Sequence, residues 1–189
     1  MNILINESQM DEILQGEFSE IKTMDKDILG KGMFHHVYPS AFNPNIVYKI
    51  GSEETVNSYY DIFVKNPQIF PRVYKRGSVD VKTFGGVKVS ASYVMLEKLN
   101  TKPFEDFWLY IDEYFDNEFQ NKLKDYNNSY DELVSVGQLV KKNEGIGVYK
   151  RYMNLLKLVQ RLLKIKKYPD IHIGQFGYDN NGKLKCLDF

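Results

Sequence analysis

Three oxygen-bearing side chains near the end of this sequence have types and spacing that suit metal-assisted chemistry. Asp170 and Gln175 lie five residues apart after a helical pattern, and Asp188 follows eighteen residues after Asp170. Carboxylate and amide oxygens can hold a divalent cation, and a carboxylate can also orient an attacking hydroxyl group. A turn from Asp179 to Gly182 would return the chain so that Asp188 meets Asp170. These residues predict a cation site used in phosphoryl transfer.

Two other reactive residue types lie in the same stretch. His172 is either a hydrogen-bonded structural histidine or a catalytic residue, and the sequence leaves both interpretations open. Cys186 lies in an apolar run with no neighbour that would activate its thiol, which is typical of a small buried strand residue. As the single cysteine, it excludes an intramolecular disulfide.

A glycine pair earlier in the chain suits phosphate binding. Gly30 and Gly32 are separated by one residue and lie between two β-type runs. Glycines at such positions let backbone N–H groups approach a phosphate closely. Val37, five residues beyond the second glycine, would pack against a planar base. An ordinary glycine-bearing hairpin is the alternative interpretation.

Lys49 lies inside an otherwise apolar strand pattern. A buried ammonium group is costly unless it is paired, so this residue predicts an anionic partner. Glu54 or Glu53, in the first turn of the next helix, would supply a carboxylate, and Asp61 is a third candidate. A lysine that faces solvent from an alternating strand is the alternative.

Short β-type runs must position these residues in the first half of the chain. Residues 1–20 have a helical pattern that begins with a capping box at Ser8 and Asp11. One further helix is expected from Ser52, as its N-cap, to about Val64. A two-residue hairpin turn is expected at residues 85–86. The pattern predicts strands over residues 21–29, 34–38, 46–50, 72–76, 79–84, 86–90 and 92–99.

Helical patterns replace the β-type runs in the second half. An aromatic-rich helix is expected over residues 101–124, and the strongest 3.6-residue period falls in residues 148–165. Between them the sequence predicts a loop, a short helix and a break, over residues 125–130, 131–140 and 141–147. The chain thus predicts an α+β protein with an extension over residues 1–20, a β-rich part over 21–99 and a helical part over 100–189.

Composition excludes several classes of protein. The 189 residues carry 25 basic and 25 acidic side chains, so the formal net charge is zero and general nucleic-acid binding is not indicated. No apolar run has the length of a membrane span, and no signal peptide is recognisable. We expect a cytoplasmic protein. Frequent Asn, Lys, Ile and Tyr are typical of AT-rich genomes, such as those of some bacteria and their viruses.

In their order along the chain, these motifs resemble the protein-kinase-like superfamily, especially atypical and small-molecule kinases. The resemblance covers residues 21–189 and implies a two-lobed fold, with an antiparallel β-rich N-lobe containing one helix and a minimal, mostly helical C-lobe. The matching residues are Gly30, Gly32, His35 and Val37 (glycine-rich loop), Lys49 (strand lysine), Met95, Glu97 and Leu99 (hinge), Asp170, His172 and Gln175 (catalytic loop), and Asp188 and Phe189 (metal-binding motif).

The resemblance implies ATP and Mg²⁺ as cofactors, and it implies a role for each matching residue. Lys49 would contact the α- and β-phosphates, steadied by Glu54, and Asp170 would orient the acceptor hydroxyl. Gln175 and Asp188 would hold magnesium. The adenine and phosphate contacts would come from Gly30, Gly32, Val37, Met95, Glu97 and Leu99.

The sequence also departs from the family pattern. His35 replaces the third glycine of the loop, Gln175 replaces the usual asparagine, and the sequence ends at Phe189, before the part that carries peptide substrates in protein kinases. A longer natural chain would restore that part. Two functions are therefore expected: a phosphotransferase for an unknown acceptor, acting alone or completed by a protein partner, or a weak or inactive kinase-like (pseudokinase) binding module. Exposed aromatic side chains would favour the binding module, namely Phe107, Trp108, Tyr110 and Tyr114.

Overall fold

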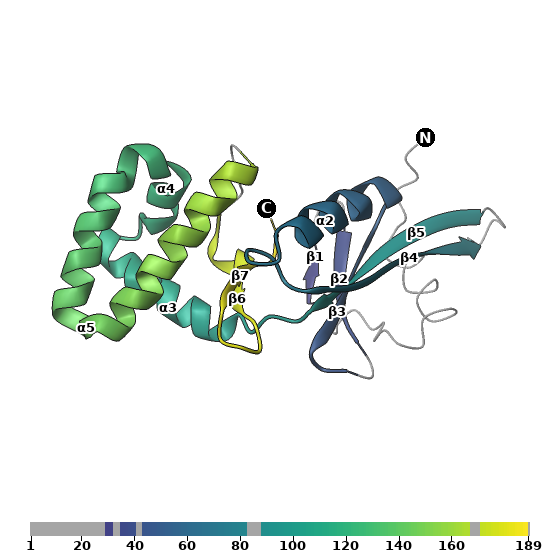
Figure 1. The fold of residues 1–189 in the computed structure, drawn as a ribbon, viewed down its shortest axis with the longest axis horizontal. Helices are drawn as coiled ribbons and strands as arrows, with labels where there is room; N and C mark the ends of the chain where they lie inside the picture. The colour runs from purple at the N-terminus through teal and green to yellow at the C-terminus, as the bar shows by residue number, and fades with distance from the viewer. Residues whose placement is uncertain (1–28, 32–34, 41–42, 83–87, 167–170, 189) are drawn as a thin grey trace. The chain divides into compact units, whose positions relative to one another are not determined.

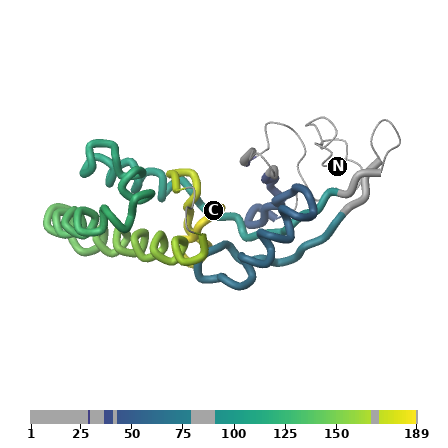
Figure 2. The backbone as a smooth tube through the Cα atoms, turned by 90° about the horizontal axis from the view of Figure 1, so that it is seen from above, coloured from purple at the N-terminus to yellow at the C-terminus, as the bar shows by residue number. Residues whose placement is uncertain are grey.

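The computed structural model describes residues 29–31, 35–40, 43–82, 88–166 and 171–188 of this α+β chain (Figures 1 and 2). The expected helix over residues 1–20 lies outside the described residues, as does nearly all of the expected strand over 21–29. The expected turn at residues 85–86 also lies outside them. The chain divides into two compact units, which are Met1–Pro67 with Pro71–Lys98, and Gln68–Phe70 with Leu99–Phe189.

Unit 1 contains a five-stranded antiparallel sheet in the order β1-β2-β3-β5-β4. One helix, α2, joins β3 to β4 and packs against the sheet (Figure 1). Its residues Val56 and Phe63 are buried. The bounds of these elements are β1 Gly30–Lys31, β2 His35–Pro39, β3 Ile46–Gly51, α2 Glu53–Lys65, β4 Val73–Lys82 and β5 Lys88–Glu97.

Helix α2 begins where the sequence predicts. Ser52 is its N-cap, and the Ser52 hydroxyl accepts a hydrogen bond from the backbone N–H of Thr55 at 3.3 Å. This bond satisfies one of the N–H groups that a helix start leaves without an intrahelical partner. Glu53 and Glu54 occupy the first turn, where negative charge complements the helix dipole. The expected N-cap is confirmed.

Strands β4 and β5 are each one long strand, so the prediction of two short strands for each was wrong. The expected break in β4 falls at Gly77, which pairs in register with Tyr93 on β5. A Cβ atom at Gly77 would come within 2.6 Å of the Tyr93 hydroxyl oxygen. The glycine therefore makes room for a cross-strand ring instead of forming a turn.

The first helices of unit 2 divide a segment for which one helix is expected. They are α3 Lys102–Asp112, the 3₁₀ helix η2 Glu113–Phe115 and α4 Phe119–Lys124. The break lies at Asp116 and Asn117, whose φ angles of 50° and 65° are left-handed. The Asp112 carboxylate accepts a hydrogen bond from the backbone N–H of Phe119 at 2.8 Å and fixes the new start. The prediction of a single helix over 101–124 was wrong, because the left-handed backbone at Asp116 and Asn117 cannot continue a right-handed helix.

Helix α5 spans Tyr126–Ile165 with a kink at Gly145, where φ is 82° and ψ is 179°. The expected break over 141–147 thus shrinks to one glycine, and the loop expected over 125–130 was wrong because most of it is helical. The two segments fold back on each other (Figure 1). The Tyr152 hydroxyl donates to the Leu133 carbonyl oxygen at 2.7 Å. In a straight helix these residues would lie nearly 30 Å apart, at about 1.5 Å of rise per residue.

A short hairpin completes unit 2. The 3₁₀ helix η3 Ile173–Gln175 leads into β6 Phe176–Tyr178, and β7 Leu184–Cys186 returns antiparallel to it. The Asp179 carboxylate accepts hydrogen bonds from the backbone N–H groups of Asn181 and Lys183, which shapes the turn. Cys186 is fully buried in β7, as the sequence predicts.

Aromatic packing holds this hairpin against the helices. Phe176 on β6 lies 5.2 Å from Phe104 on α3, between ring centroids, and 6.3 Å from Trp108. Trp108 in turn lies 4.9 Å from Phe119 on α4. Such pairs contribute about 0.5–1.5 kcal/mol each beyond the area that they bury. In the described parts of the chain, no helix combines the length and apolar character needed to cross a membrane.

Candidate functional site

Lys49 is a deeply buried charged residue of the sheet in unit 1. It lies on β3 and exposes only 2% of its surface. Its cross-strand neighbours are Val37 on β2 and Val94 on β5. Neighbours in register lie on the same face of a sheet, so the aliphatic part of Lys49 lies between two valines. This environment excludes the solvent-facing alternative for Lys49.

An aromatic ring lies against the Lys49 ammonium. Nζ lies 3.5 Å from the centroid of the Tyr59 ring and 5.9 Å from that of Phe63, both on α2. A cation over an aromatic face is attracted by the negative face of the ring, most strongly where water is excluded. Glu54, the expected partner, is exposed in the first turn of the same helix. Its ion pair with Lys49 therefore stays a prediction, and Tyr59 is a contact that the sequence did not indicate.

Three residues predicted to meet the nucleotide share one row across the sheet. Gly30 pairs with Val37, and Val37 pairs with Lys49. Adjacent strands are spaced about 4.8 Å apart, so this row spans roughly 10 Å from the glycine to the lysine. Gly32 lies outside the described residues.

The expected hinge residues end strand β5 and continue beyond it. Met95 pairs with Tyr48 and Lys75, and Glu97 is 8% exposed. The backbone N–H of Glu97 donates to the Arg72 carbonyl oxygen at 2.9 Å. That donor is engaged within the sheet, so a hinge contact from Glu97 would use its carbonyl oxygen.

Leu99 belongs to unit 2, since the division of the chain falls between Lys98 and Leu99. Its side chain is 5% exposed. Asn100 and Tyr178 exchange backbone hydrogen bonds of 2.9 and 3.0 Å, which tie this segment to strand β6. A Cβ atom on Gly177 would come within 2.9 Å of the Leu99 Cβ, so the segment lies close against the hairpin.

Two of the three residues expected to supply metal-binding or catalytic-loop oxygens, Gln175 and Asp188, lie on neighbouring backbone segments of unit 2. The backbone of Gln175 accepts a hydrogen bond from the N–H of Leu187 at 2.7 Å, which extends the pairing of β6 and β7 by one residue. Asp188 follows Leu187 directly and is partly exposed, while Gln175 is 7% exposed. Asp170 lies outside the described residues, so its predicted meeting with Asp188 is untested.

His172 precedes η3 and is half-buried. Its carbonyl oxygen accepts a hydrogen bond from the backbone N–H of Gln175 at 3.1 Å. The imidazole lies about 3.4 Å from where a Cβ atom on Gly174 would be. The ring thus packs along its own loop, and its predicted catalytic role is untested.

The predicted magnesium site would have few protein ligands. Among the residues that the structure describes, no three His, Cys, Asp or Glu side chains are grouped to hold a metal ion. Magnesium is commonly held by one or two carboxylates together with substrate phosphates. Asp188 and the amide oxygen of Gln175 would supply part of such a set, with the remainder coming from Asp170 or the nucleotide.

The aromatic side chains of α3 and η2 do not form the exposed surface that would favour a binding module. Phe107 and Trp108 expose 5% and 3% of their surface, and Tyr110 and Tyr114 are half-buried. The Tyr114 hydroxyl also donates to the Glu144 carboxylate at 2.9 Å. These aromatic residues serve mainly as packing for unit 2.

The sequence prediction missed a cavity in unit 2. It is lined by one face of the second segment of α5 and by the turn between β6 and β7. Basic residues at spacings of three and four in residues 148–165 were a signal for it. That spacing indicates a basic face on the helix, but it does not indicate that the turn between β6 and β7 lies against this face.

Comparison with known proteins adds no assignment. No protein-family model matches the sequence, and no curated protein shows a significant match.

Proposed function

We propose that this chain is a kinase-like protein that transfers phosphate from Mg-ATP to an acceptor hydroxyl group. The burial of Lys49 carries the proposal. This lysine lies on the third strand of an antiparallel sheet, directly before the helix, in one row with Gly30 and Val37. Protein kinases have the phosphate-binding lysine on their third strand, followed by a helix that carries its glutamate partner.

Burial of the Lys49 ammonium group has a desolvation cost. An ammonium group loses its hydration in an apolar site, and an apolar side chain of the same size would fill the space without that cost. The Tyr59 ring offsets part of this loss. A desolvated ammonium binds a phosphate oxygen more strongly than one in water, because the effective dielectric constant is lower. A buried lysine is therefore suited to phosphate binding.

The other residues have separate roles in the proposed reaction. Lys49 would bind and orient the phosphate chain, and Asp170 would orient the acceptor hydroxyl and accept its proton. Gln175 and Asp188 would hold Mg²⁺, which neutralises charge on the phosphates. Most of the catalysis would come from positioning and charge neutralisation, which require little movement of protein groups.

Calorimetric titration with Mg-ATP tests the nucleotide part of this proposal. We expect wild-type protein to bind Mg-ATP, and we expect Lys49→Ala and Asp188→Asn each to weaken binding by about tenfold or more, since each removes a charged contact. Two exposed residues supply matched controls, Lys65→Ala in unit 1 and Asp131→Asn in unit 2. Both controls should bind as wild type does. Wild-type protein that releases no heat and shows no thermal shift with Mg-ATP would refute the proposal.

Turnover distinguishes the phosphotransferase from a kinase-like binding module. Incubation with ATP labelled at the γ-phosphate should release or transfer the label in wild type, and Asp188→Asn should abolish this. Tight binding of Mg-ATP by wild type with no label lost over hours would instead favour the binding module.

A further inference from the structure

A cavity of about 270 Å³ within unit 2 has a cationic lining. Four basic side chains line it, together with two amides and a phenol, and no aspartate or glutamate does. These polar residues are Gln68, Arg151, Asn154, Lys157, Arg161, Tyr178 and Lys183. Buried leucines, Leu158 and Leu184, contribute apolar surface. A concave site with an apolar base and several donors is typical of small-ligand binding.

The geometry of helix α5 brings these cations together. Arg151, Asn154, Lys157 and Arg161 follow one another at spacings of three, three and four residues, which places them on one face of a helix. Lys183 comes from the turn between β6 and β7. The Asp179 carboxylate in this turn accepts backbone hydrogen bonds from Asn181 and Lys183, so it is already engaged in shaping the turn.

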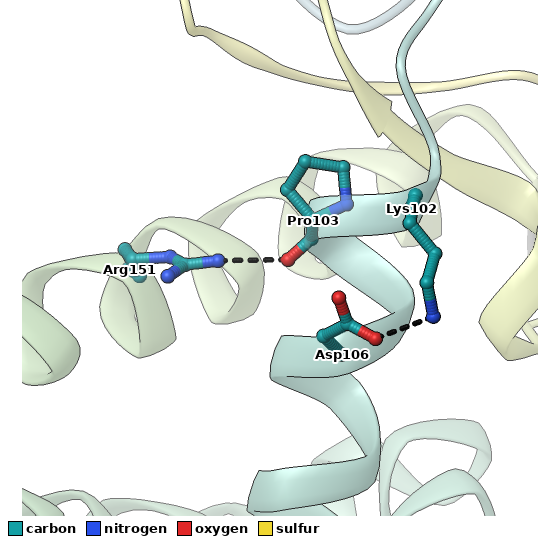
Figure 3. Close-up of polar contacts among 4 residues, drawn as sticks. All are labelled: Lys102, Pro103, Asp106 and Arg151. Carbon is teal, nitrogen blue, oxygen red and sulfur yellow. Dashed lines mark hydrogen bonds and ion pairs between the residues drawn. The ribbon is translucent and has the colours of Figure 1, made fainter.

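Arg151 is held in place by several contacts. Its Nη2 donates to the Pro103 carbonyl oxygen at 2.9 Å (Figure 3), and its Nε donates to the Tyr178 hydroxyl oxygen at 3.3 Å. The guanidinium also lies 4.7 Å from the centroid of the Phe107 ring. A guanidinium has five N–H donors, so these bonds orient it and leave others for a ligand. A group that is already oriented loses less entropy on binding.

The remaining cations of the cavity lack acidic partners. Lys157, Arg161 and Lys183 form no ion pair with any residue in the described parts of unit 2. By contrast, Lys102 on α3 pairs with Asp106 at 2.6 Å (Figure 3). Like charges that face one cavity repel each other, and an anion that binds there relieves the repulsion.

We propose that this cavity binds a small phosphorylated anion with two or more negative charges. Its volume lies slightly below the range of about 300–1,000 Å³ that is usual for drug-sized ligands, which favours a compact ligand. Its concave shape favours such an anion over a polynucleotide, which needs an extended basic surface. Lys49, Gln175 and Asp188 do not line the cavity, so this proposal does not depend on the nucleotide proposal.

Titration with inorganic pyrophosphate in the absence of magnesium tests the site. We expect wild-type protein to bind one pyrophosphate, and Lys157→Ala combined with Arg161→Ala to weaken binding by about tenfold or more, since two charged contacts are removed. The matched control combines Lys150→Ala with Lys164→Ala. These residues are exposed on the same helical segment, carry the same charge and do not line the cavity. The control should bind within about twofold of wild type, and so should Lys49→Ala.

Three outcomes would overturn the proposal. The first is no binding of pyrophosphate by wild type at millimolar concentration. The second is an equal loss of affinity in both double variants, which would show diffuse attraction by positive charge instead of a site. Tighter binding of a single-stranded RNA oligonucleotide than of pyrophosphate would lead to the same conclusion. The third is loss of pyrophosphate binding in Lys49→Ala, which would place the anion at the proposed nucleotide site.

Discussion

Lys49 places a charged group inside the sheet of unit 1. It is 2% exposed, between two valines and against the Tyr59 ring. Most buried charges of this kind are paired or functional. The structure therefore gives a prediction that separates a structural role for Lys49 from a functional one.

Lys49→Met should lower the free energy of unfolding by less than about 2 kcal/mol, because methionine fills similar volume and the change removes the cost of desolvating the charge together with the contacts that the charge makes. Urea unfolding followed by circular dichroism measures this, with Lys65→Met as the exposed control. A loss of more than about 2 kcal/mol in Lys49→Met would show that the charge mainly serves stability.

Tyr152 gives a second prediction at the residue scale. Its hydroxyl donates to Leu133 in a fully buried position, and burial raises the pKa of this hydroxyl above its ordinary value. Tyr152→Phe should lower the free energy of unfolding by about 1–3 kcal/mol at pH 7, because the Leu133 carbonyl oxygen loses its buried donor. Tyr149→Phe, at a half-buried position on the same segment, should cost less.

The raised pKa of Tyr152 also predicts how stability changes with pH. The unfolded tyrosine loses its proton near pH 10, while the folded one keeps it to higher pH, so stability is full below pH 10 and is lost above it. This one group contributes a slope of at most about 1.4 kcal/mol per pH unit. Urea unfolding between pH 8 and pH 11 should therefore show a steeper decline in wild type than in Tyr152→Phe. Equal slopes would contradict the assignment.

At the scale of elements, helix α5 depends on one glycine. Gly145 has φ 82° and ψ 179°, a region that is essentially restricted to glycine. Gly145→Ala should therefore lower the free energy of unfolding by about 1–3 kcal/mol. Gly147, two residues later in the helix with open space around it, is the matched control. Gly147→Ala should raise stability by about 0.5–1 kcal/mol.

Urea unfolding of the two variants measures both effects. Equal effects of the two substitutions would contradict the assigned kink. Loss of the kink would also separate the Tyr152 hydroxyl from Leu133, because the two segments of α5 could then no longer fold back.

Local signals explain which elements the sequence predicts well. The N-cap at Ser52 and strands β2 and β3 depend on neighbouring residues, and the structure has them where expected. The strand break expected at residues 77–78 was wrong, because Gly77 pairs with Tyr93 on another strand. The helix break at Asp116 and Asn117, whose φ angles are left-handed, was not predicted. Sequence patterns predict where a helix starts and whether a segment is helix or strand. The structural role of a single glycine or polar residue depends on tertiary contacts.

The candidate site follows the same division. The apolar residues around Lys49 predicted that this lysine lies in a strand, and the structure shows that its side chain is buried there. Tyr59, ten residues later on α2, was not predicted as its contact, because that contact depends on how α2 packs on the sheet. The cationic cavity was missed for a similar reason, since Lys183 joins the α5 face only through the hairpin turn.

At the scale of the whole molecule, the formal net charge of zero conceals a local concentration of charge. Four basic side chains line one cavity of unit 2, although acidic and basic residues are equal in number over the chain. The residues proposed for phosphate binding belong to unit 1, and those proposed for magnesium belong to unit 2.

The most direct test measures the thermal stability of the whole chain with and without Mg-ATP, for wild type and for Lys49→Met. At about 100 times its dissociation constant, a ligand adds about 2.7 kcal/mol of stability. We predict this increase for wild type and little or none for Lys49→Met, although Lys49→Met should remain folded without ligand. No increase in wild type, or the same increase in both proteins, would contradict a nucleotide site that contains Lys49.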